Sequence, residues 1–139
     1  MKIVVDGMGG DNAPAEILKG CAIAVKEYGV EIVVTGDPEK IGNAVKENSI
    51  DMSGISVEPS DGVITMEDNP MSLRTEKKDS SLGKAFRMLK NGEADALVSA
   101  GNSGAIIVGA TIIAGRIRGI NRPAFAAVFP GADGYTMLL

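Results

Sequence analysis

Histidine is absent from this chain of 139 residues, and cysteine occurs once, at Cys21. Without histidine, neither a Ser-His-Asp nor a Cys-His arrangement for nucleophilic catalysis can be built. A lone cysteine forms no internal disulfide, and the chain holds no Cys/His cluster of the zinc type, so we expect a cytoplasmic protein without a bound metal. Cys21 lies on the apolar stripe of a predicted helix, where a small buried side chain is expected rather than a nucleophile.

Positive charge and long apolar runs are also scarce. The net charge is -4 and the isoelectric point is near 4.8, which disfavours a general nucleic-acid binder because phosphate backbones select uncompensated Lys and Arg. The most apolar stretch, residues 105–115, falls short of the about 20 residues that span a bilayer, so it is predicted to form a buried helix. No export signal is expected, because the first residues have the pattern of a strand followed by an acidic residue and glycines. A composition of 45% hydrophobic and 4% aromatic residues is typical of a single α/β domain, here residues 1–139.

Strand-like and helix-like segments alternate along the chain. Strands are predicted at residues 2–5, 31–36, 55–59, 63–66, 94–101 and 124–129, with one more beginning at residue 135. Helices are predicted from Asn12 to residue 28, around residues 38–45, and from a cap at Asp79 or Ser80 to Gly92. The apolar stripe of the first helix is expected at Ile17, Cys21, Val25 and Tyr28. This alternation predicts an α/β fold with a mainly parallel sheet and helices on both faces.

Two glycine-rich loops, residues 7–12 and 99–104, each lead from a predicted strand into a predicted helix. In parallel sheets, ligands lie beyond the carboxyl ends of the strands, and glycines there let an anion approach backbone N–H groups. Asn12 and Asn102 stand at the two helix entrances, where each either caps its helix or binds the ligand. A dinucleotide motif fails because Asn12 occupies the position of the third glycine. Asp37, the one candidate for a ribose-binding acid, is better explained as a turn and helix cap.

The segment from Arg74 to Lys90 reverses the acidic balance of the chain. Arg74, Lys77 and Lys78 precede the predicted helix and could reach an anion at its N-terminus, with hydroxyls from Ser80 and Ser81. The basic residues farther along, Lys84, Arg87 and Lys90, are expected on a solvated face.

Four motifs in register carry a family resemblance: "MGGDNAP" at residues 8–14, "KKDSS" at 77–81, "GEADALVSAGNSGA" at 92–105 and "RPA" at 122–124. Together they resemble the bacterial phosphate acyltransferases of phospholipid synthesis, over essentially the whole chain. The resemblance implies a three-layer α/β/α fold similar to isopropylmalate dehydrogenase and phosphate acetyltransferase, a homodimer, and peripheral attachment to the inner membrane surface. No cofactor is expected.

Three departures from the family stand out. Ser103 replaces a usual Thr, and Thr75 and Glu76 dilute a stretch that is usually more basic. Family members also continue through a second half that helps form the dimer and the membrane-facing tip, so this chain is expected to correspond to an N-terminal portion.

The implied reaction transfers an acyl group from acyl-acyl carrier protein to inorganic phosphate, giving acyl phosphate. Because no activated nucleophile is present, we expect direct transfer without an acyl-enzyme. Asn12, Lys78 and Asn102 are the predicted catalytic residues, and Asp11, which repels an anion, is expected to orient a lysine or to bind the pantetheine arm. The predicted phosphate- and substrate-binding residues are Gly9, Gly10, Asp11, Arg74, Lys77, Ser80, Ser81, Ser99, Gly101, Ser103 and Gly104.

The surface from Arg74 to Lys90 is the expected dock for the acidic carrier protein. Two alternatives stay open: a phosphate acetyltransferase-like enzyme that uses acyl-coenzyme A, and a non-catalytic domain that binds an anion or a partner.

Overall fold

A computed structural model describes residues 1–132 and 134–138 of the chain. Its centre is a parallel sheet of four strands in the order β3-β2-β1-β4, with bounds β1 (Lys2–Asp6), β2 (Glu31–Gly36), β3 (Ile55–Pro59) and β4 (Ala96–Val98). β1 lies in the middle, where Val4 pairs with Val33 of β2 and with Leu97 of β4. Successive side chains of a strand point to opposite faces, so the neighbouring buried residues Val4 and Val5 place apolar side chains on both faces of β1.

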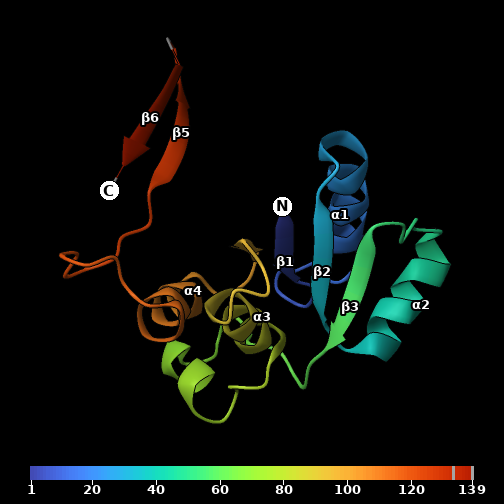
Figure 1. Cartoon of the computed structure of the whole chain (residues 1–139), viewed down its shortest axis with the longest axis horizontal. Helices are drawn as coiled ribbons and strands as arrows, with labels where there is room; N and C mark the ends of the chain where they lie inside the picture. The colour runs from blue at the N-terminus through green and yellow to red at the C-terminus, as the bar shows by residue number, and fades with distance from the viewer. Residues whose placement is uncertain (133, 139) are drawn as a thin grey trace.

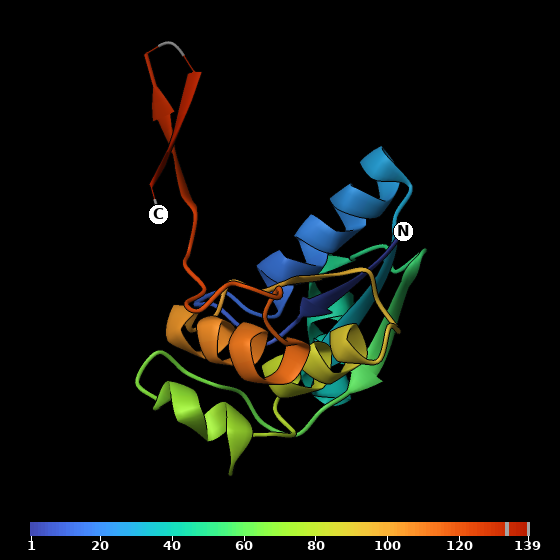
Figure 2. The same ribbon diagram turned by 60° about the vertical axis from the view of Figure 1, so that its left-hand side comes forward.

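Helices cover both faces of the sheet (Figures 1 and 2). On one face, α1 (Ala15–Tyr28) and α2 (Pro38–Asn48) pack on Val5, Ile32 and Val34. On the other, α3 (Ser81–Lys90) packs on Val4 and Val33. Outside α3 lie η1 (Pro70–Arg74), α4 (Ser103–Val108) and η2 (Gly109–Ala114), a π-helix that continues α4. The predicted three-layer α/β/α fold is therefore confirmed.

Local capping chemistry explains where the helices begin. Asp37 accepts from the N–H groups of Glu39 and Lys40, with Pro38 as the first helical residue of α2, which confirms the predicted cap. Of the two caps considered for α3, the structure uses Ser80, whose hydroxyl accepts from the N–H of Gly83.

Five local expectations were wrong. The first helix begins at Ala15 rather than Asn12, and its buried stripe includes Leu18, whereas Tyr28 is 75% exposed. Residues 63–66 form an irregular loop rather than a strand, and the strand predicted at 94–101 has only three residues. The apolar stretch at 105–115 is helical, but it lies on an outer layer, where Ile112 is 41% exposed.

The last predicted strands do not join the sheet. β5 (Ala127–Gly131) and β6 (Gly134–Leu138) pair antiparallel with each other and form a hairpin that stands away from the α/β body (Figure 1). The strand expected at 124–129 begins three residues later, and Leu139 lies outside the described residues. Among the described helices, none has both the length and the apolar character needed to cross a membrane.

Candidate functional site

The two glycine-rich loops lie side by side, because β1 and β4 are neighbours and both end at the same edge of the sheet. A Cβ atom built on Gly9 would lie 3.1 Å from the Cα of Gly101 and 2.4 Å from Oδ2 of Asp6. Gly10 has a φ of 106°, which side-chain-bearing residues rarely adopt. The packing of one loop on the other therefore requires glycine at position 9. The binding of an anion at these glycines stays a prediction.

Asp6 is the charged residue between these loops, and we did not predict it. Asp6 is the last residue of β1 and is 2% exposed. Its carboxylate accepts hydrogen bonds from Ser81 Oγ at 2.5 Å, Ser99 Oγ at 2.8 Å and the Met8 N–H at 3.3 Å. Ser99 Oγ in turn accepts from the N–H of Gly101 at 3.1 Å. The only signal in the sequence was a carboxylate directly after a buried strand. Two of the predicted binding residues, Ser81 and Ser99, thus contact Asp6.

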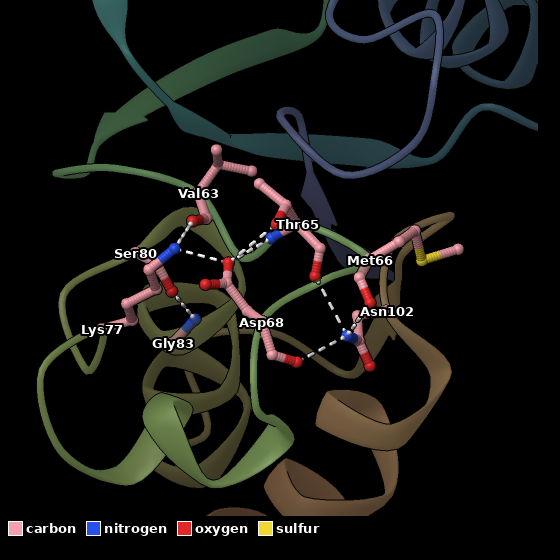
Figure 3. Close-up of polar contacts among 8 residues, drawn as sticks. All are labelled: Val63, Thr65, Met66, Asp68, Lys77, Ser80, Gly83 and Asn102. Atoms are coloured by element: carbon pink, nitrogen blue, oxygen red, sulfur yellow. Dashed lines mark hydrogen bonds and ion pairs between the residues drawn. The ribbon is translucent and has the colours of Figure 1, made fainter.

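Asn102 caps α4 and anchors residues 63–69, which we call the cavity loop (Figure 3). Its Oδ1 accepts from the N–H of Ala105 at 3.0 Å. Its Nδ2 donates to the carbonyl of Thr65 at 3.0 Å, with longer contacts to those of Met66 and Asp68. The side chain is 7% exposed, so these contacts occupy both of its polar atoms. The cap that we considered for Asn102 is present.

Lys77 holds the cavity loop from the side opposite Asn102 (Figure 3). Its Nζ donates to the carbonyl of Val63 at 3.0 Å and pairs with Asp68 Oδ2 at 2.5 Å. Lys77, followed by the Thr65 N–H, lowers the pKa of the Asp68 carboxyl from its ordinary value by stabilising the charged form. The predicted phosphate contact of Lys77 therefore competes with an existing ion pair.

The cavity loop and the two glycine-rich loops line an open cavity of about 260 Å³ with both polar and apolar walls. Its lining includes the carboxylate residues Asp11 and Glu67 and no Lys or Arg among the described residues. The complete lining is Met8, Gly10, Asp11, Val63, Ile64, Thr65, Met66, Glu67, Gly101 and Asn102. Three predicted site residues besides Asn102 therefore meet here: Gly10, Asp11 and Gly101.

Asn12 does not cap α1 with its side chain. The helix begins three residues later behind Pro14, and only the backbone carbonyl of Asn12 takes part, accepting from the Glu16 N–H at 3.2 Å. The Asn12 side chain is exposed, and it makes no hydrogen bond to another described residue. In the second loop, Ser103 is exposed as well, whereas Gly104 packs so closely on Pro70 that a Cβ would lie 2.7 Å from its ring.

Arg74 and Lys78 lie away from this cavity. Together with Arg87 and Lys90 they line a separate hollow, whose apolar part includes Ile112. Arg87 pairs with Asp79 at 2.9 Å, so it is less free than a solvated face implies. Near the start of α3, Ser80 caps the helix and Ser81 binds Asp6, so neither hydroxyl joins the cavity. The structure therefore divides the predicted anion site between two surfaces.

Cys21 is buried, as expected, on the face of α1 that packs on the sheet. Burial raises the pKa of its thiol to about 11, because the apolar surroundings disfavour the thiolate. Near neutral pH the residue therefore stays protonated and is a poor nucleophile.

Comparisons with known proteins agree with the motifs. A family model described as fatty acid synthesis protein matches residues 1–139. The chain is 44% identical over 140 residues to the phosphate acyltransferase of Clostridium novyi (strain NT), covering 100% of this chain and 42% of that protein. It is 40% identical over 139 residues to the phosphate acyltransferase of Clostridioides difficile (strain 630), and this match covers 99% of this chain and 41% of that protein.

A relative from another genus gives the same result. The phosphate acyltransferase of Geotalea daltonii (strain DSM 22248 / JCM 15807 / FRC-32) is 42% identical over 139 residues, covering 100% of this chain and 40% of that protein. The chain thus spans about two fifths of the length of these relatives and matches their N-terminal portion. On the match over its whole length, the chain belongs to the fatty acid synthesis protein family.

Proposed function

We propose that this chain provides the phosphate site of an acyltransferase that forms acyl phosphate from an acyl thioester and inorganic phosphate. The observation that carries the proposal is the meeting of two glycine-rich loops at the carboxyl edge of the sheet, around an open cavity of about 260 Å³. Membership of the fatty acid synthesis protein family and relatives named phosphate acyltransferase support the same reaction class.

The proposed chemistry suits a chain without histidine. A phosphate oxygen forms a bond to the thioester carbon, the carbonyl oxygen becomes an oxyanion, and the C–S bond then breaks to release a thiolate, which takes a proton from solvent. Phosphate is already charged near neutral pH and a thiolate is a good leaving group, so no general base is needed. The site must hold phosphate in line with the carbon and stabilise the oxyanion.

Backbone N–H groups are the proposed donors to phosphate. The cavity lining includes two carboxylates and, among the described residues, no cation, so side-chain charge at this wall opposes phosphate and the backbone N–H groups must supply the attraction. Asn12 is the proposed side-chain donor, because its amide is exposed beside Asp11 and is not used in capping α1. In this arrangement Asn102 shapes the cavity by anchoring residues 63–69, and Lys77 anchors the same loop through Val63 and Asp68.

Acyl-acyl carrier protein is the proposed acyl donor. The hollow lined by Arg74, Lys78, Arg87 and Lys90 gathers four basic residues beside apolar Ile112 and Ile113, a surface that fits an acidic protein. The homodimer and the peripheral attachment to the inner membrane surface stay predictions that come from the family resemblance.

The proposal is tested by assaying acyl phosphate formation by this chain, with acyl-acyl carrier protein and acyl-coenzyme A as alternative acyl donors. Calorimetry measures the affinity for phosphate. Asn12→Ala should lower the rate by about a hundredfold, the smaller end of the loss seen when one positioned hydrogen-bond donor is removed. Its thermal midpoint should stay unchanged. Asn43→Ala, another exposed asparagine, on α2, is the matched control.

Each other outcome has a definite meaning. A higher rate with acyl-coenzyme A would favour the acetyltransferase-like alternative. Phosphate binding without turnover from either donor would favour an anion-binding domain. The proposal fails if phosphate neither binds nor reacts, or if Asn12→Ala and Asn43→Ala behave alike.

A further inference from the structure

We propose that Asp6 is the positioning residue of the candidate site: its buried carboxylate holds both glycine-rich loops in the arrangement that binds phosphate. This inference rests on the proposed function for the identity of the ligand. Its structural part, the attachment of both loops to one carboxylate, rests on contacts of Asp6 alone.

Asp6 contacts three separate segments of the chain. Its Oδ1 accepts from Ser81 Oγ at 2.5 Å and from the Met8 N–H at 3.3 Å, and its Oδ2 accepts from Ser99 Oγ at 2.8 Å. The segments are the first glycine-rich loop, the start of α3 and the second glycine-rich loop. Burying the Asp6 carboxylate, which is 2% exposed, removes its hydration, and its hydrogen bonds must offset that cost. The three donors therefore determine where the carboxylate lies.

The charge of Asp6 also sets the direction of the hydrogen bonds. An ionised carboxylate only accepts, so Ser99 must point its hydroxyl proton at Oδ2. The lone pairs of Ser99 then face the N–H of Gly101, which donates at 3.1 Å. The same carboxylate thereby orients the Met8 N–H of one loop directly and the Gly101 N–H of the other through a hydroxyl.

The first glycine-rich loop packs closely against the Asp6 carboxylate. A Cβ on Gly9 would lie 2.4 Å from Asp6 Oδ2, so the first loop rests directly on the carboxylate oxygen. On the far side, the single hydroxyl proton of Thr35 lies within reach of two carbonyls, that of Ser81 at 2.9 Å and that of Val5 at 3.2 Å, and the shorter bond fixes the start of α3 on the sheet. Asp6 is therefore clamped between a fixed element, α3, and the two loops that it orients.

The test compares Asp6→Asn with Asp37→Ala in this chain. Both carboxylates lie at the same edge of the sheet, Asp6 at the end of β1 and Asp37 just after β2, but Asp37 caps α2 and its hydrogen bonds go to Glu39 and Lys40 rather than to a glycine-rich loop. The side-chain amide introduced by Asp6→Asn would donate to one of the two serines and reverse its hydroxyl. We expect Asp6→Asn to weaken phosphate binding by about tenfold or more, the scale of loss that follows from a small misplacement of binding groups. Asp37→Ala should lower the thermal midpoint and leave phosphate affinity unchanged.

Amide hydrogen exchange provides a readout that does not depend on phosphate. The N–H groups of Met8 and Gly101 should exchange about tenfold faster or more in Asp6→Asn, because their acceptors are lost or reoriented. If the unsubstituted chain binds no phosphate, the proposed function fails, and the exchange rates still decide whether Asp6 orders both loops. Unchanged exchange in Asp6→Asn overturns the inference, as does faster exchange with unchanged phosphate affinity.

A second pair of variants applies if Asp6→Asn does not fold. Ser99→Ala removes the link from Asp6 to Gly101, whereas Ser99→Thr keeps the hydroxyl. Faster Gly101 exchange and weaker phosphate binding in Ser99→Ala, both restored in Ser99→Thr, would support the inference. Equal behaviour of the two variants would refute it.

Discussion

Replacing Asn102 by alanine should destabilise the chain at two places at once. The substitution removes the Oδ1 acceptor of the Ala105 N–H at the start of α4. It also removes the Nδ2 donor that holds the carbonyl of Thr65 in the cavity loop. The side chain is 7% exposed, so water does not readily replace either partner.

The expected loss follows from these two contacts. An N-cap replaced by alanine costs about 1 kcal/mol, and a neutral hydrogen bond contributes about 1 kcal/mol. The contacts to Met66 O at 3.5 Å and Asp68 O at 3.4 Å are too long to add much. A total of about 2 kcal/mol corresponds to a fall in thermal midpoint of about 8 °C for a chain of this size.

Thermal and urea unfolding followed by circular dichroism measure the loss. Asn102→Ser separates the two parts, because serine also caps a helix but cannot reach the cavity loop, so it should lose about half as much. Asn43→Ala is the control for replacing an exposed asparagine. The reasoning is refuted if Asn102→Ala lowers the midpoint no more than Asn43→Ala, and the capping part is refuted if Asn102→Ser and Asn102→Ala lose the same amount.

Two further predictions concern packing and charge. Gly109→Ala should lower the free energy of unfolding by about 1–3 kcal/mol, because its Cβ would lie 2.1 Å from the buried Phe86 ring. Gly42→Ala meets open space, so it should stabilise α2 by about 0.5–1 kcal/mol. Urea unfolding measures both changes. Equal effects would contradict this packing. Lys77 lowers the pKa of Asp68 in the folded state, so the stability from their pair is present above the unfolded pKa and is lost on acidification below about pH 4. Asp68→Asn should lack this step in a series of thermal midpoints from about pH 6 to 3, and superimposable profiles would contradict it.

Patterns of short range were read correctly from the sequence. The caps at Asp37, Ser80 and Asn102 follow from polar side chains that satisfy free N–H groups within three residues, and the structure contains all three. The alternation of strands and helices determined the α/β/α class, because apolar strands must be covered on both faces. The cap considered for Asn12 was absent because Pro14 precedes the first residue of α1.

The contents of the site depend on contacts between residues far apart in the chain. Ser81 and Ser99 are separated from Asp6 by 75 and 93 residues, so no local pattern identifies the carboxylate that joins them. The position of Lys77 beside Asp68, and of Arg74 and Lys78 on another surface, depends on how η1 and the cavity loop fold back on α3. The sequence by itself therefore determined the layers, the caps and the two glycine-rich loops, because local hydrogen bonding and hydrophobic periodicity set these. Only the tertiary structure decided which charged groups reach the loops, because strand order and loop packing set those distances.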